Sequence, residues 1–145
     1  KFNLKYIDID SQIEHEQNKN ISQIFSEHGE KYFRECERKI IKKIFTNKNL
    51  IIATGGGTPI YKNNSLIIKN LGIVIYLYCS PKTIYEHLIN DKNFNSRPLI
   101  KNNFSRIKDL YNKRNNIYYS CCDLILKCDK RDLNYLADKI FFLFN

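Results

Sequence analysis

Three consecutive glycines follow a short apolar segment and form the clearest candidate for a ligand site. The apolar run Leu50–Ala53 is followed by Thr54 and then by Gly55, Gly56 and Gly57. Glycine lets backbone amides approach an anion closely because no Cβ stands in the way. In open parallel sheets, ligands bind outside the carboxyl ends of the strands, where this segment would lie. The pattern predicts an anion site, and the structural alternative is a tight turn from strand to helix.

Two carboxylates follow another short apolar segment, residues 4–9. Asp8 and Asp10 are two positions apart, so at the end of a strand their side chains would point to the same face. Carboxylates beside a glycine anion site indicate one contact to a metal ion and one to a hydroxyl, as in phosphoryl transfer. The structural alternative is that Asp10 caps the helix that follows, and both roles can hold together.

Two arginines lie on helix stripes that are otherwise apolar, where an unpaired guanidinium is unfavourable. For Arg34 the structural alternative is a salt bridge to Glu30 or Glu37, which lie four and three residues away. The helix of Arg114 offers only Asp109, which lies off the face. The pattern therefore favours an external anion for Arg114 more strongly than for Arg34.

Apolar strands separated by helices must hold these residues. Strands without polar alternation, typical of a sheet covered on both faces, are predicted over residues 50–53, 73–79 and 124–126. Longer helices are predicted over about residues 30–45, 105–119 and 132–144. The fold class is α/β, a doubly wound parallel sheet with flanking helices.

The segment between the first strand and the glycines contains two local helix signals. Asn20 is a good N-cap for a helix that starts at Ile21, and Gly29 interrupts it before the longer helix. In that longer helix one face is predicted to be buried, and it consists of Phe33, Cys36, Ile40 and Ile44.

Composition narrows the class of protein. A length of 145 residues, with 43% hydrophobic residues, fits a single globular domain spanning residues 1–145. The net charge of +9 is spread along the whole chain rather than gathered into a stripe with aromatics, so we expect no nucleic-acid partner. No apolar run has the length of a membrane span, and five cysteines without a CxxC pair indicate reduced thiols that fill the core. We expect a cytoplasmic monomer without a membrane partner.

The order and spacing of five motifs resemble the shikimate kinase family over nearly the whole chain. These motifs are Asp8-Ile9-Asp10 with Ile13-Glu14, Gly29-Glu30 with Phe33-Arg34 and Glu37, Thr54-Gly55-Gly56-Gly57, Arg97-Pro98-Leu99-Ile100, and Arg114 with Tyr118 and Asp123. The resemblance implies transfer of the γ-phosphoryl group of ATP to the 3-hydroxyl of shikimate, with Mg²⁺, in aromatic amino-acid biosynthesis.

The resemblance also implies roles for residues that would hold shikimate. Asp10 would bind ring hydroxyls and accept the proton of the attacking one. Arg34 and Arg114 would clamp the carboxylate with their planar forks, which lysine does poorly. The glycines Gly55, Gly56 and Gly57 would contribute backbone amides on the substrate side of the phosphoryl site.

Further roles implied by the resemblance concern the nucleotide and its metal. Asp8 would hold Mg²⁺ through water. Arg97, in a mobile lid over about residues 91–103, would swing over the phosphates as closure excludes water. The family usually has an arginine near the adenine, and His87 stands at that position here.

One family motif has no counterpart in the 145 residues. P-loop kinases begin with a strand and a GxxxxGK[ST] loop that cradles the phosphates, and this sequence contains neither. We expect this strand to be the first and central one, between residues 50–53 and 73–79. The resemblance to the family implies roughly 25–30 further residues before Lys1. A chain without methionine that opens just before a strand fits such a fragment.

Two alternatives remain open at this point. Another P-loop small-molecule kinase, such as a gluconate-type kinase, would share the fold, although a substrate without a ring carboxylate has no use for both Arg34 and Arg114. A degenerate binding domain without catalysis would retain the substrate pocket without the phosphate loop.

Overall fold

Two compact units make up the chain, an N-terminal unit of residues 2–72 and a C-terminal unit of residues 73–145. The computed structural model describes residues 3–44, 49–90, 104–129 and 131–144. The predicted lid over residues 91–103, including Arg97, lies outside the described residues. No helix in the described ranges has both the length and the apolar character needed to cross a membrane.

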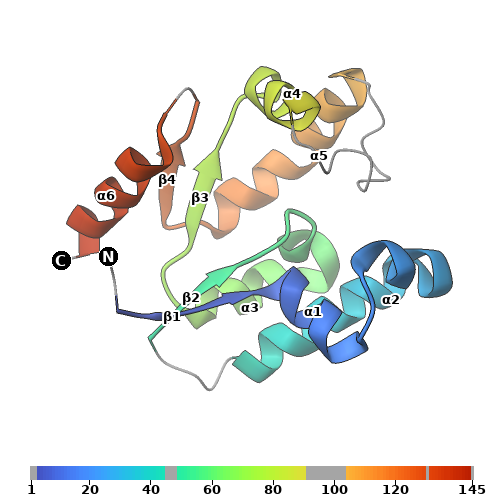
Figure 1. Ribbon diagram of the computed structural model, residues 1–145. Helices are drawn as coiled ribbons and strands as arrows, with labels where there is room; N and C mark the ends of the chain where they lie inside the picture. Colours follow the sequence, from blue (N-terminus) through green and yellow to red (C-terminus); the bar gives the residue numbers. More distant parts are fainter. Residues whose placement is uncertain (1–2, 45–48, 91–103, 130, 145) are drawn as a thin grey trace. The chain divides into compact units, whose positions relative to one another are not determined.

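The N-terminal unit places two parallel strands beside four helical segments (Figure 1). Its elements are β1 (Lys5–Asp8), α1 (Ile9–Gln17), α2 (Ile21–Ile44), β2 (Leu50–Ala53), the 3₁₀ helix η1 (Thr58–Asn63) and α3 (Asn64–Leu71). In the register of β1 and β2, Asp8 stands opposite Ala53. Because the strands are parallel, the chain leaves both at the same sheet edge, so α1 and the glycine loop begin there together.

Asp8, rather than Asp10, begins α1. The predicted strand over residues 4–9 ends at Asp8, whose Oδ1 accepts a hydrogen bond of 3.0 Å from the Ser11 amide. Because Asp8 is the cap, the helix begins at the next residue, Ile9. Its buried face contains Ile9 and Ile13. The prediction that both carboxylates project from one strand is therefore wrong, and the alternative that Asp10 caps the helix is not observed, because Asp8 is the cap.

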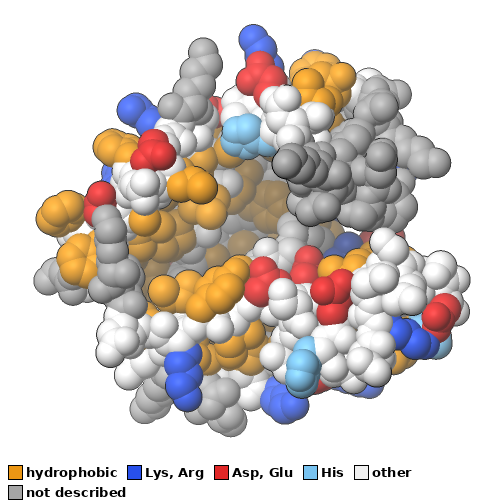
Figure 2. All heavy atoms as spheres, viewed as in Figure 1, with side chains coloured by type: hydrophobic (Ala, Val, Ile, Leu, Met, Phe, Trp, Pro, Cys, Tyr) orange, Lys and Arg blue, Asp and Glu red, His pale blue; other side chains and the backbone are white. Residues whose placement is uncertain are grey.

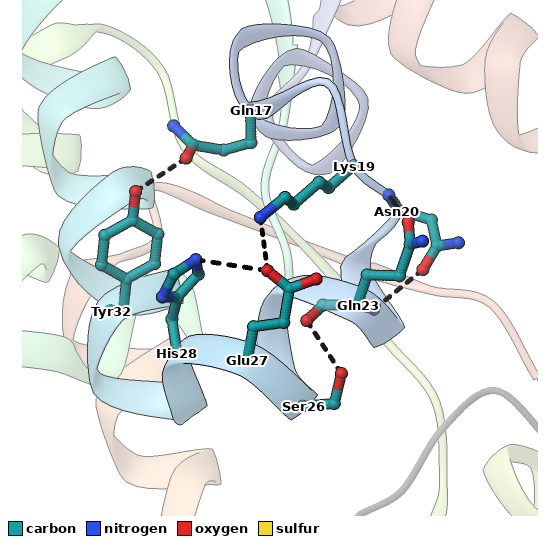
Figure 3. Close-up of polar contacts among 8 residues, drawn as sticks. All are labelled: Gln17, Lys19, Asn20, Gln23, Ser26, Glu27, His28 and Tyr32. Carbon is teal, nitrogen blue, oxygen red and sulfur yellow. Dashed lines mark hydrogen bonds and ion pairs between the residues drawn. The ribbon is translucent and has the colours of Figure 1, made fainter.

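The turn between α1 and α2 is fixed by polar side chains from both helices (Figure 3). Asn20 caps α2 as predicted, since its Oδ1 accepts from the Gln23 amide at 2.9 Å and its own amide donates to Gln23 Oε1 at 3.0 Å. Lys19 pairs with Glu27, and Tyr32 donates to Gln17 at 2.7 Å. The end of α1 is thereby tied to the first half of α2.

Gly29 interrupts α2, as the sequence predicts. Its φ of 77° and ψ of 172° lie outside the helical region and produce a kink. Beyond it, the predicted stripe is buried, and its members are Phe33, Cys36, Ile40 and Ile44. The second half of α2 is therefore a regular amphipathic helix, and burial of this stripe fixes which of its faces points to solvent.

The C-terminal unit has a second pair of parallel strands. Its elements are β3 (Ile75–Tyr78), α4 (Pro81–Asn90), α5 (Phe104–Cys121), β4 (Leu124–Lys127) and α6 (Leu133–Phe144). Ile75 stands opposite Leu124. Tyrosines join α5 to β3, with the rings of Tyr76 and Tyr118 at 5.2 Å and those of Tyr78 and Tyr111 at 6.3 Å.

The class is α/β with parallel strands and flanking helices, as predicted. Full coverage of the strands is not observed in the described part of the chain, because Tyr6 is 62% and Leu77 57% exposed. Apolar side chains reach the surface, as the orange atoms in Figure 2 show. The single doubly wound sheet, its additional central strand and the single domain remain predictions.

We expect Gly29→Ala to lower the free energy of unfolding by about 1–3 kcal/mol, because this backbone region is almost restricted to glycine. A Cβ there meets no atom within 4 Å, so strain rather than crowding is the cause. Gly72→Ala is the matched control, since it is equally open and its φ of 161° is extended. Equal denaturant midpoints for both variants would contradict the prediction.

Candidate active site

Four of the predicted site residues of the N-terminal unit are brought together by the structure. A Cβ on Gly55 would lie 3.2 Å from Asp10 Oδ1. A Cβ on Gly57 would lie 2.6 Å from Arg34 Nη1 and closer still to Cζ. The guanidinium therefore lies directly against the backbone of the glycine loop, and only glycine fits at position 57 without displacing it.

Arg34 is held by two carboxylates of its own helix. Its Nε and Nη2 donate to Glu30 Oε1 at 3.2 and 3.1 Å, and its Nη1 donates to Glu37 Oε2 at 2.8 Å. Burial by itself would lower the pKa of Arg34, but the hydrogen bonds and charges of Glu37 and Glu30 raise it above its usual range. The salt-bridge alternative is thus observed. It uses three of the five N–H donors and leaves one on each Nη for another anion.

Glu37 connects α2 to the glycine loop, a role that the sequence analysis did not predict. Its carboxylate is fully buried and accepts hydrogen bonds from Arg34 and from the hydroxyl of Thr58. The Thr58 amide donates in turn to the Gly55 carbonyl at 3.0 Å. Helical spacing predicts Glu37 only as a partner of Arg34, and the sequence signal for its second contact is the threonine directly after the glycines.

A second set of contacts from α2 supports the chain after the glycines. Arg38 Nη1 donates to the Lys62 carbonyl at 2.7 Å and to Asn64 Oδ1 at 2.6 Å. Lys62 and Asn63 have positive φ values of 43° and 59°, which are uncommon for residues other than glycine. The buried Asn64 also donates to the Thr58 carbonyl at 3.0 Å, so the loop is fixed at both ends.

Asp10 presents an acceptor without a partner. Its Oδ1 is buried and makes no hydrogen bond within the described part of the protein. Burial raises the pKa of Asp10 above its ordinary value, the negative charges of Glu37, Asp8 and Glu14 raise it further, and Arg34 opposes them. Such a group can accept a hydrogen bond or a proton from a ligand hydroxyl.

Asp8 has a structural role as the cap of α1, and its other oxygen accepts from the Tyr6 hydroxyl at 3.3 Å. Among the described residues, no group of three or more histidine, cysteine or acidic side chains forms a cage for a metal ion. Mg²⁺ characteristically keeps several waters and binds through one or two carboxylates together with substrate phosphates. Asp8, with Asp10 nearby, fits this manner of binding, in which water intervenes.

The remaining predicted residues belong to the C-terminal unit. Arg114 is half-buried on α5 and forms no ion pair with any residue that the structure describes. His87 is exposed on α4, where its charge helps to lower the pKa of Asp129, after the larger effect of hydrogen bonds from Thr83 and Ser80. A common site of Arg114 and His87 with the N-terminal cluster remains a prediction.

Comparison with known proteins identifies the family. Residues 1–143 match the family model described as shikimate kinase. The chain belongs to the shikimate kinase family. It is 36% identical over 140 residues to the shikimate kinase of Sulfurihydrogenibium sp. (strain YO3AOP1), covering 97% of this chain and 82% of the relative. It is 38% identical over 142 residues to that of Caldicellulosiruptor saccharolyticus, covering 97% and 80%.

Solved shikimate kinases share the fold. The enzyme from Acinetobacter baumannii in complex with shikimate superposes with a TM-score of 0.86 at 29% identity, covering 97% of this chain and 78% of that one. The enzyme from Bacteroides thetaiotaomicron gives 0.83 at 26% identity, covering 97% and 82%. The resemblance seen in the motifs is thereby confirmed, and the family assignment makes the chain a phosphotransferase.

We expect Gly57→Ala to displace the Arg34 guanidinium and to lower the free energy of unfolding by about 1–3 kcal/mol, as overpacking of a close contact does. Gly72→Ala, whose new Cβ meets nothing within 4 Å, is the control for a methyl group in open space. Denaturant unfolding measures the difference. An unchanged midpoint for Gly57→Ala would show that the guanidinium does not pack against this loop.

Proposed function

We propose that this shikimate kinase transfers the γ-phosphoryl group of ATP to the 3-hydroxyl of shikimate in aromatic amino-acid biosynthesis. The observation that carries the proposal is the cluster of Asp10, Arg34 and the glycine loop. In this cluster Asp10 would accept a proton and Arg34 would bind a carboxylate. The glycine loop would let backbone amides approach an anion closely.

The carboxylate of the substrate would be received by arginines. Glu30 and Glu37 fix the guanidinium plane of Arg34 and leave one N–H on each Nη, which suits a carboxylate in two-pronged contact. Arg114 would supply the second fork, consistent with its lack of an ion-pair partner among the described residues. Together the two arginines would select for an anionic ring substrate.

Asp10 would act on the attacking hydroxyl. Its unpaired Oδ1 provides the acceptor, and its raised pKa makes it a stronger base than an exposed aspartate. Gly55 permits the close approach of the loop to this carboxylate, since any side chain there would meet Asp10, Glu37 and Thr58 within 3.2–3.4 Å. Gly55, Gly56 and Gly57 would direct backbone amides toward the substrate side of the phosphoryl group.

Mg²⁺ and ATP complete the proposed reaction. When bound, Mg²⁺ would neutralise charge on the phosphates of ATP, and Asp8 would hold it through water. His87 would lie beside the adenine, and Arg97 would contact the phosphates. We propose further that the protein works as a cytoplasmic monomer in one domain and takes no nucleic acid or membrane as partner.

A coupled assay of ADP release in the full-length protein, as its gene encodes it, tests the function. Shikimate should stimulate ADP release at least 100-fold more than gluconate, because only shikimate offers a carboxylate on a ring with neighbouring hydroxyls. Absence of shikimate-dependent turnover in a folded protein that binds ATP would contradict the proposal. Binding of shikimate without turnover would instead identify the degenerate binding domain.

Asp10→Asn should lower kcat by roughly 100-fold or more, because the amide cannot accept the hydroxyl proton. The melting temperature at neutral pH should rise rather than fall. A carboxyl with a raised pKa in the folded state stabilises the fold below its unfolded pKa, and this contribution is lost as the pH rises through the folded-state pKa. At neutral pH the buried Asp10 carboxylate therefore destabilises the fold, and Asp10→Asn removes its charge.

The pH profile provides a second readout for Asp10. The acid limb of kcat/KM should lie above the ordinary aspartate range and should move to lower pH in Glu37→Gln, which removes a charge that raises the Asp10 pKa. Asp132→Asn is the matched control, since Asp132 only caps α6 through the amides of Asn134 and Tyr135. Retention of more than half the activity in Asp10→Asn would exclude the proposed base.

Arg114→Lys should weaken transition-state binding of shikimate by about 2–3 kcal/mol, because the charge remains but the two-pronged contact is lost. The KM for ATP should change little. Arg106→Lys, on an exposed position of the same helix, is the control and should leave both parameters unchanged. Equal weakening of both substrates by Arg114→Lys would show that Arg114 is structural.

A further inference from the structure

Cys79 and Cys128 directly follow β3 and β4 and stand opposite each other. The last pair in the register of these strands is Tyr78 with Lys127, and the Cys128 amide still donates to the Tyr78 carbonyl at 2.8 Å. Paired strands run roughly 4.8 Å apart, and disulfides join residues whose Cα atoms are about 4.4–6.8 Å apart. The backbone therefore holds the two cysteines at a separation that a disulfide can span.

The thiol side chains of Cys79 and Cys128 are also neighbours. The two thiols are close enough for each to affect the pKa of the other, and Cys128 Sγ donates to the Leu126 carbonyl at 3.2 Å. Both cysteines are half-buried, whereas Cys36 and Cys121 are buried. The prediction that all five cysteines fill the core is thus wrong for this pair and for Cys122, which is also half-buried. Half-buried neighbouring thiols are open to reagents that fully buried thiols exclude.

We propose that Cys79 and Cys128 form an oxidation-sensitive pair that closes to an intrachain disulfide in the presence of a low-molecular-weight disulfide such as oxidised glutathione. One thiolate attacks the glutathione disulfide and releases a first glutathione thiolate. The second cysteine then attacks the mixed disulfide and releases the other. Two protein thiols and one oxidised glutathione become one protein disulfide and two reduced glutathiones.

The order of attack follows from the surroundings of the thiols. Burial raises the pKa of Cys79 to about 11, and neighbouring Cys128 and Asp129 add to the effect. Burial also raises the pKa of Cys128, but the neighbouring Cys79 thiol acts in the opposite direction. Cys128 is therefore the better first nucleophile, and Cys79 the resolving thiol.

The bridge would act on the start of α4. Asp129, next to Cys128, accepts a hydrogen bond of 2.9 Å from the Ser80 amide, next to Cys79. Ser80 also contacts the Thr83 hydroxyl at 3.0 Å in the first turn of α4. A disulfide would make this non-covalent connection between β4 and α4 permanent. The proposal concerns the C-terminal unit only and does not depend on the proposed function.

Peptide mass mapping of the full chain tests the proposal. After incubation with oxidised glutathione under native conditions and quenching by alkylation, trypsin separates Cys79, in residues 70–82, from Cys128, in residues 128–130, and from residues 115–127. We expect a cross-linked peptide joining 70–82 to 128–130, at least 10-fold more abundant than any other cross-link. Hydrogen exchange at the start of α4 should slow in the oxidised protein.

Variants distinguish the pair from general thiol reactivity. Cys79→Ser should retain a stable glutathione adduct on Cys128, because the resolving thiol is missing. Cys122→Ser is the matched control, since Cys122 is half-buried in the same unit, and should form the bridge as the unaltered protein does. Glutathione adducts without a bridge in the unaltered protein, or preferential cross-linking of residues 115–127, would overturn the proposal. Neither readout requires kinase activity.

Discussion

The buried carboxylate of Glu37 is the interaction on which the N-terminal unit depends. A carboxylate without solvent is unfavourable unless it is paired and hydrogen-bonded, and Glu37 satisfies this condition through Arg34 and the Thr58 hydroxyl. One partner lies on the same helix and the other directly after the glycine loop. Because the buried Glu37 carboxylate must bond to both partners, it fixes the distance between α2 and the loop. It thereby also fixes the position of the Arg34 guanidinium against Gly57.

The same charge shapes the chemistry of the site. Glu37 supports Arg34 as a cation and, after the larger effect of burial, its negative charge raises the pKa of Asp10. The proposed carboxylate receptor, Arg34, and the proposed proton acceptor, Asp10, thus owe part of their properties to one residue that the substrate need not touch. This arrangement depends on the parallel pairing of β1 and β2, because parallel strands place the start of α1 and the glycine loop at the same edge of the sheet.

The C-terminal unit also contains two parallel strands, but different residues follow them. At the ends of β3 and β4 the paired positions are Cys79 and Cys128 rather than an aspartate and a glycine loop. Tyrosines instead of charges join its sheet to α5, where Arg114 interrupts the aromatic stripe. The unit therefore provides a helix for one arginine and, at the strand ends, a pair of neighbouring cysteines.

The sequence by itself determined the class of fold, the family, and the types of the residues at the site. Apolar runs without alternation predicted the parallel strands, Asn20 and Gly29 marked the helix start and the kink, and the spacing of Phe33, Cys36, Ile40 and Ile44 predicted the buried face of α2. These features depend on local propensities and periodicity, which act over a few residues. Only the tertiary structure decided that Asp8 rather than Asp10 caps α1 and that Glu37 binds Thr58 across 21 positions of sequence. It also decided that one Asp10 oxygen has no partner among the residues that the structure describes. Whether a side chain finds a partner depends on residues remote in sequence, and periodicity contains no information about them.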